Sequence, residues 1–236
     1  MSRSLARTAV AVLSSLLFVA SSAAQTASKY LAPGFSALPK DSRIAILPLD
    51  VELFSLSAGG VPEPRADWTK DALGHMQEAL RVHAGKLGVE PTFVDERSAD
   101  AFAEQLGLHA AVARSIELHH AIGGAWALPT KQGRLDWSFD DAMQPLQVKT
   151  GARYGLFVFV RDSYASAERK AAMVAMALLG VALRAGTQAG YASLVDLETG
   201  RVLWFNRLQR GKGDLRDAES ATDSIEALLE GFPAVR

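Results

Sequence analysis

The chain has 236 residues, with 25 lysine and arginine side chains against 26 acidic ones and a formal net charge of −1. It contains no cysteine, which excludes disulfides, thiolate nucleophiles and cysteine-bound zinc or iron–sulfur clusters. A near-neutral charge without a basic block offers no electrostatic footprint for nucleic acid, so we expect no nucleic-acid partner.

The first 24 residues have the three parts of a secretory signal peptide. Arg3 and Arg7 supply the basic start, and residues 9–20 are apolar apart from two serines. Small side chains at residues 22–24 then predict cleavage near Ala24. A transmembrane anchor needs about 20 apolar residues, and this run is shorter. We therefore expect a soluble periplasmic protein, and not a lipoprotein, because a lipid anchor needs a cysteine.

Residues 25–42 are polar and turn-rich, which predicts a leader segment ahead of one α/β domain over residues 43–232. Residues 44–49 form a short apolar run between charges, typical of a buried strand, with Pro48 near its end. The composition of residues 55–64 predicts a loop.

Helical spacing of apolar residues predicts an amphipathic helix over residues 67–87, followed by a second strand over residues 91–94. A further helix is expected over residues 98–122, with a break near Gly107. Residues 123–139, rich in glycine and tryptophan, predict a long loop.

Residues 154–160 are aromatic and β-branched and predict the clearest strand. Two more strands, over residues 189–197 and 201–208, are joined at Gly200 in a hairpin, and residues 215–229 predict a last helix. Strands that alternate with helices and end in a hairpin predict the α/β class, with a mixed β-sheet, this hairpin in the C-terminal half and helices packed on the sheet.

Three segments carry motifs of a known family. They are the proline-ended strand at residues 44–49 before a long helix, the Thr-Gly-Ala-Arg-Tyr element at residues 150–154, and the Val-Asp-Leu-Glu-Thr-Gly-Arg-Val-Leu-Trp hairpin at residues 195–204. They resemble the anticodon-binding-like α/β domain of bacterial envelope proteins. That family includes the curli secretion-channel protein, the activators of penicillin-binding proteins and the N-terminal domain of the Tol translocation protein.

The resemblance covers about residues 43–229 and implies an anticodon-binding-like fold that binds proteins or assembles into rings, without a common catalytic residue. The chain departs from the family in two places. Arg153 stands where the family usually has an acid, and the lipobox cysteine is missing. The missing cysteine argues against a lipid-tethered role.

Motifs for catalysis, metal binding and phosphate binding are absent from the sequence. The five histidines do not form HExxH, no G-x-S-x-G elbow occurs, and Ser193 falls inside a predicted strand. We therefore expect no catalytic, metal-binding or cofactor-binding residue. A periplasmic hydrolase or small-ligand carrier remains the alternative function.

Polar residues cluster at the ends of the predicted strands and would meet if the hairpin pairs beside the central strand. One interpretation is an ion-pair and capping network, with Asp214 as a helix N-cap and Arg161 beside an acid. The other is a recognition surface shared with the Trp126–Trp137 loop. The candidate interaction residues are Lys131, Arg134, Asp136, Trp137, Arg161, Asp162, Ser163, Asn206, Asp214 and Arg216.

Residues 171–183 carry no charge and predict an apolar helical insertion over about residues 168–186. The run is too short to span a bilayer. Burial against the domain's own sheet, self-association and peripheral membrane contact all remain open. The residues expected to make that contact are Met173, Met176, Leu179 and Leu183. Together these features favour a non-enzymatic binding or scaffolding module for cell-envelope assembly, with an envelope protein or a second copy as partner.

Overall fold

The computed structural model describes residues 29–87, 89–211 and 213–236. The predicted signal peptide over residues 1–24 lies outside these residues. Within the described chain, seven strands form one mixed sheet. The strands are β1 (Arg43–Ile46), β2 (Asp50–Leu56), β3 (Pro62–Pro64), β4 (Glu90–Phe93), β5 (Tyr154–Ala165), β6 (Gln188–Asp196) and β7 (Val202–Arg210).

The long strand β5 organises this sheet. Strands β1 and β2 follow one another along one edge of β5, both parallel to it, and β6 runs antiparallel along the other edge. Beyond these, β4 pairs with β1, β3 with β2, and β7 with β6. The predicted mixed sheet with a hairpin in the C-terminal half is therefore confirmed.

A one-residue irregularity separates β1 from β2. Ile46 pairs with Leu156, but Asp50 pairs with Phe159, so the β1–β2 side has one residue more than β5 over this stretch. Pro48 lies in the interruption, as predicted, where its missing N–H costs no ladder hydrogen bond. Strand β2 itself was not predicted, because its alternation of apolar and charged residues runs into a stretch with loop composition.

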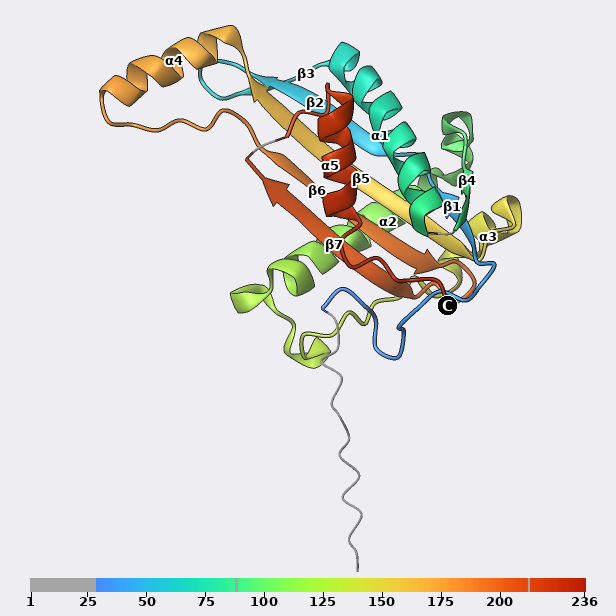
Figure 1. The fold of residues 1–236 in the computed structure, drawn as a ribbon. Coiled ribbons are helices and arrows are strands. Elements are labelled where there is room, and N and C mark those ends of the chain that lie inside the picture. The colour runs from blue at the N-terminus through green and yellow to red at the C-terminus, as the bar shows by residue number, and fades with distance from the viewer. Residues whose placement is uncertain (1–28, 88, 212) are drawn as a thin grey trace, which may run out of the picture.

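The described residues form five α-helices. They are α1 (Ala66–Leu87), α2 (Ala103–Ile116), α3 (Gln144–Thr150), α4 (Ala167–Leu178) and α5 (Ala218–Leu228). Figure 1 shows α1 and α5 on one face of the sheet and α2 on the opposite face. Helix α2 passes through Gly107 without the predicted break and continues into a wider turn over Glu117–Ile122. The remaining helical pieces are single turns at Glu96–Ser98, Asp100–Phe102, Gly124–Trp126, Pro129–Lys131 and Asp140–Met143.

The alternation of side chains along the strands divides the core into two layers. Leu156 and Val158 of β5 face the α1–α5 layer, whereas Phe157 faces the layer of α2 and the segment before β5. In β6, Leu194 faces the first layer and Tyr191 the second. Because helices or loops cover both faces, the central strands are apolar at nearly every position.

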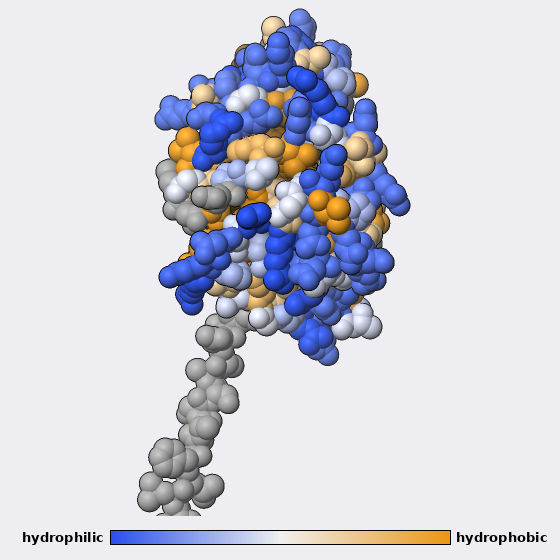
Figure 2. Space-filling view, turned by 90° about the vertical axis from the view of Figure 1, so that its right-hand side faces the viewer, coloured by the Kyte–Doolittle hydropathy of each residue, from blue (hydrophilic) through white to orange (hydrophobic). Residues whose placement is uncertain are grey.

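Helix α4 lies outside this layered body. It connects β5 to β6 through residues 166–187, which we name the arm, and it extends away from the sheet in Figure 1. The face of the molecule on the far side from the arm is mostly hydrophilic, with small separate apolar patches (Figure 2). Among the described residues, none of the helices combines the length and the apolarity needed to cross a membrane.

Candidate functional site

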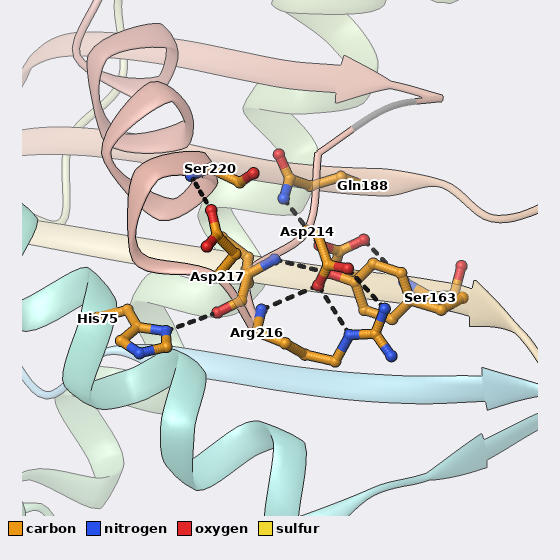
Figure 3. A network of polar contacts seen from close by, with 10 residues as sticks. His75, Ser163, Gln188, Asp214, Arg216, Asp217 and Ser220 are labelled. Carbon is orange, nitrogen blue, oxygen red and sulfur yellow. Dashed lines mark hydrogen bonds and ion pairs between the residues drawn. The ribbon is translucent and has the colours of Figure 1, made fainter.

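The strand ends at the base of the arm carry a connected group of polar side chains, drawn in Figure 3. The group joins β5, β6, the loop before α5, and α1. Its centre is Asp162, a carboxylate that is 2% exposed near the end of β5. The register of the sheet places Asp162 opposite Gln188, the first residue of β6.

Three donors surround the Asp162 carboxylate. The Gln188 amide donates to Oδ2 over 2.8 Å and the Ser163 backbone N–H donates to Oδ1 over 2.9 Å. The Tyr164 hydroxyl also donates to Oδ2. A buried charge needs such partners, since an unpaired carboxylate in the core is strongly unfavourable. These hydrogen bonds hold β5 and β6 together where the arm begins and ends.

Gln188 extends the network to α5. Its Oε1 accepts from Arg210 Nε over 2.7 Å and from Ser224 Oγ over 3.1 Å. The orientation of the Gln188 amide is therefore determined, because reversing it would place N–H groups against the Arg210 guanidinium.

Tyr164 links the network to the loop before α5. Its hydroxyl accepts from the Leu215 N–H over 2.7 Å, and the Leu215 carbonyl is 3.1 Å from His75 Nδ1 on α1. The Arg216 guanidinium lies over both the Tyr164 and Trp68 rings, 4.1 and 4.6 Å from their centroids. Such cation–π contacts with two rings fix the direction of Arg216.

The pKa values of these groups follow from burial and from their partners. Burial raises the pKa of Asp162, against the opposite effect of its hydrogen bonds from Tyr164 and Gln188. Burial and the nearby Asp162 carboxylate raise the pKa of Tyr164, so its hydroxyl keeps its proton. The hydrogen bond from Arg216 lowers the pKa of Asp214.

A pocket of about 210 Å³ opens beside this network. Its walls include Tyr164 and Arg216 from the network and Lys170, Gly186 and Thr187 from the arm. The network therefore forms one wall of a groove at the root of α4.

The structure brings only some of the predicted interaction residues together. Asp162, Ser163, Asp214 and Arg216 belong to the network just described. Arg161 points to the opposite face of the sheet, since neighbouring residues of a strand alternate.

The other strand residues make structural contacts. Arg161 Nη2 pairs with Asp50 over 2.7 Å, so the expectation of an acidic partner is confirmed. Asn206 donates to the carbonyls of Ala227 and Leu228 over 2.9 and 3.0 Å, at the end of α5. The N-cap of α5 is Asp217, which accepts from the Ser220 N–H over 2.9 Å, so the prediction of Asp214 as N-cap was wrong.

The loop that holds the remaining predicted residues lies elsewhere. The Trp137 carbonyl accepts from the Val202 N–H at the start of β7, and Val202 pairs with Val195 of β6. Asp162, in contrast, pairs with Gln188 at the other end of β6. These positions are seven residues apart along β6, or roughly 20 Å at 3.3 Å per residue. Within the loop, Lys131 lies over the Trp137 ring at 4.8 Å, and Arg134 and Asp136 are exposed. The loop does not share a surface with the Asp162 network.

The arm helix is shorter than predicted and is not part of the core. The helix ends at Leu178, and the chain turns at Gly180, whose φ is 77°. Leu183 therefore lies in the coil that returns to β6. None of the residues of α4 is buried. Leu178 and Leu179 are 84% and 75% exposed, and Met173 and Met176 are half-buried. Burial of this helix against the domain's own sheet is therefore excluded for the single chain.

A serine–histidine pair that the sequence did not predict lies under α2. His109 Nε2 is 2.6 Å from Ser193 Oγ, a distance typical of a nucleophile and its base. Burial, however, lowers the pKa of His109 to about 3, too low for a useful base near neutral pH. Ser193 is only 1% exposed and is not in the wall of the adjacent pocket. The pair therefore joins α2 to β6 inside the core.

Sequence reasoning also missed Gln188, Arg210 and Ser224. Gln188 lies one residue before the predicted strand over residues 189–197, and only the pairing of β5 with β6 in the structure places it opposite Asp162. Among the described residues, no cluster of three or more histidine, aspartate or glutamate side chains is placed to hold a metal ion.

Comparisons with known proteins identify similar structures only. No protein-family model and no curated protein matches the sequence. A PelC dodecamer from Paraburkholderia phytofirmans is 14% identical with a TM-score of 0.40, over 86% of this chain and 94% of that chain. The LpoB C-terminal domain from Salmonella enterica is 15% identical with a TM-score of 0.32, over 77% of this chain and 88% of that one.

A lipoprotein from Neisseria meningitidis is 12% identical with a TM-score of 0.36, over 81% of this chain and 98% of that chain. All three are bacterial envelope proteins with an α/β fold, the class that the sequence resembles. Similarities at this level carry no argument about function, and the anticodon-binding-like family remains a prediction.

Proposed function

We propose that this protein is a non-enzymatic binding module of the bacterial cell envelope that associates with a second copy of itself through the arm. The observation that carries the proposal is the exposed apolar stripe along α4. Exposed positions Ala171, Val174, Ala175 and Leu178 recur at intervals of three, one and three residues, and so share one side of the helix.

The spacing of this stripe favours a helix as its partner. Spacings of three and four residues, with small and branched side chains alternating, are typical of the seam of a helix pair. The two alanines let a second helix approach to about 8 Å between axes. A lipid surface would favour basic residues along the borders of the apolar face. On α4 the charged residues are confined to the first turn, at positions 168–170.

A second copy is the partner that these features suit best. Beyond its first turn α4 is uncharged, so its partner needs a matching uncharged surface, and α4 itself provides one. Two copies related by a twofold axis would bury the same stripe on both sides. The first turn is already held in place, since Arg169 donates to the Ala58 carbonyl of the body over 3.4 Å and to the Arg184 carbonyl of the arm over 3.0 Å.

Two observations support a non-enzymatic role. Ser193 and His109 are buried in the core, and the Asp162 carboxylate already accepts hydrogen bonds from Tyr164, Gln188 and the Ser163 N–H. The envelope location rests on the signal peptide predicted from residues 1–24.

The proposal is tested by placing charge on the arm. We expect wild-type protein to form a dimer or larger assembly at micromolar concentration, measured by light scattering after size-exclusion chromatography. Leu178→Glu with Leu179→Glu should give a folded monomer with an unchanged melting temperature. Val148→Glu is the matched control, because Val148 is also 84% exposed but lies on α3, and it should leave the assembly intact.

A wild-type protein that stays monomeric at 100 μM would contradict self-association. Binding of the monomer to phosphatidylethanolamine–phosphatidylglycerol vesicles, lost in the double variant, would instead assign the arm to the membrane surface.

A further inference from the structure

A second pocket, of about 220 Å³, lies on the other face of the sheet, between α2 and the interruption that separates β1 from β2. The extra residue on the β1–β2 side displaces Pro48 and Leu49 from the regular ladder, and both residues line the pocket. Leu106 and Ala110 of α2 form the opposite wall. The pocket is therefore built into the fold at an irregular point of the sheet.

The floor of the pocket is aromatic. The His109 ring stacks on Phe157, with centroids 3.8 Å apart and planes 9° apart. Tyr191 stacks on Phe159 at 4.9 Å and 11°. All four residues line the pocket, so it presents flat ring surfaces to any molecule inside it.

Two polar atoms of this floor have no hydrogen-bond partner among the described residues. His109 uses Nε2 for Ser193, and no bond is made by its Nδ1. The Tyr191 hydroxyl makes none either. The two residues are only 5% and 2% exposed. Both residues line the pocket.

The surroundings of the pocket are electrically balanced. Burial raises the pKa of the Tyr191 hydroxyl. The negative charges of Asp50 and Glu117 raise this pKa further, and the positive charges of Arg114 and Arg161 lower it. Burial keeps His109 neutral, because it lowers the pKa of the imidazole to about 3. The charged residue in the lining, Asp50, is already paired with Arg161 over 2.7 Å, so an ion would find no unpaired opposite charge to compensate its loss of water, and the pocket suits an uncharged molecule.

We propose that this pocket binds one small uncharged aromatic molecule, with a single or fused ring and one hydrogen-bonding group, of the phenol or indole class. A closed apolar cavity of about 150 Å³ is enough for benzene, so the volume here accommodates such a ring with a substituent. The ring lies against Phe157 and Phe159, and its polar group bonds to the Tyr191 hydroxyl. This site is independent of the arm, which lies beyond the other end of β2.

Isothermal titration calorimetry of the whole protein with phenol and indole tests the proposal. We expect one site with a dissociation constant between about 10 μM and 1 mM, in which benzene binds roughly fivefold to tenfold more weakly than phenol, since it lacks the hydrogen bond. Benzoate, which carries a charge, should not bind.

Two variants assign the binding to this pocket. Ala110→Leu fills it and should abolish binding, whereas Ala111→Leu, on the exposed side of the same helix, should leave binding unchanged. Tyr191→Phe should weaken the binding of phenol to the affinity of benzene. Because this substitution removes a single oxygen atom, it provides a test even if Ala110→Leu fails to fold. The proposal would be overturned if none of the aromatic probes binds, or if wild type and Ala110→Leu bind them with equal affinity.

Discussion

At the scale of single residues, the base of the arm depends on one buried carboxylate. Asp162 accepts from Tyr164, Gln188 and the Ser163 N–H, and of these donors only the Ser163 N–H has a second acceptor, the Thr187 carbonyl at 3.1 Å. Asp214, in contrast, makes a partly exposed pair with Arg216 over 2.8 Å. The two acids belong to one network but differ in how much of the fold depends on them.

Asp162→Ala should lower the free energy of unfolding by about 2–4 kcal/mol, because it leaves buried donors without an acceptor. Asp214→Ala is the matched control and should cost less than about 1 kcal/mol, as exposed ion pairs contribute little. Urea denaturation at pH 7 measures both values. Equal losses in the two variants would show that Asp162 is not the centre of the network.

His109 makes stability depend on pH. Burial lowers its folded-state pKa to about 3, below the ordinary 6.5, so between these values the unfolded chain binds a proton that the native protein does not. The contribution of neutral His109 is therefore present above pH 6.5 and is lost as the pH falls toward 3. From pH 7 to pH 4.5, wild type should lose roughly 2–3 kcal/mol more than His109→Gln, which cannot titrate. Urea denaturation at both pH values measures the difference, and parallel losses would contradict it.

At the scale of elements, the strands that form continuous apolar runs were predicted, whereas the alternating strand β2 was not. Strands β5, β6 and β7 were recognised because their apolar runs are bounded by turn residues. Strand β2 was missed because its alternation of apolar and polar residues runs into a stretch with loop composition. Helix α4 was predicted to continue past its end at Leu178, since residues 179–183 remain apolar and only the positive φ of Gly180 marks the stop.

The pairing of β5 with the end of the arm requires glycine at position 186. A Cβ on Gly186 would lie 1.9 Å from the Ser163 carbonyl oxygen, far inside contact distance. Gly186→Ala should therefore separate the strands, weaken the 3.1 Å bond from Ser163 N to Thr187 O and cost about 1–3 kcal/mol. Faster amide exchange at Ser163 measures this opening. Gly211→Ala, where a Cβ meets nothing within 4 Å, is the control and should leave the exchange rate unchanged.

At the scale of the whole molecule, the fold class followed from the order of elements, whereas the grouping of polar residues did not. The Trp137 loop and the Asp162 network were expected to meet, but they lie at opposite ends of the β6–β7 hairpin. The contact between His109 and Ser193, 84 residues apart in sequence, has no local signal at all. Long-range contacts of this kind depend on register and layer, which a single sequence specifies only through the complete fold.

The central claim is that the arms of two copies pack side by side. Because the chain has no cysteine, Ala177→Cys introduces a unique attachment point for a spin label on α4, at an exposed position beside the stripe. Double electron–electron resonance should then show a defined distance between labels of roughly 20–30 Å, given helix axes about 8–10 Å apart. A label at Val148→Cys on α3 serves as the comparison and should give a longer distance. The account is contradicted if labels at position 177 show no dipolar coupling, or coupling no stronger than at position 148.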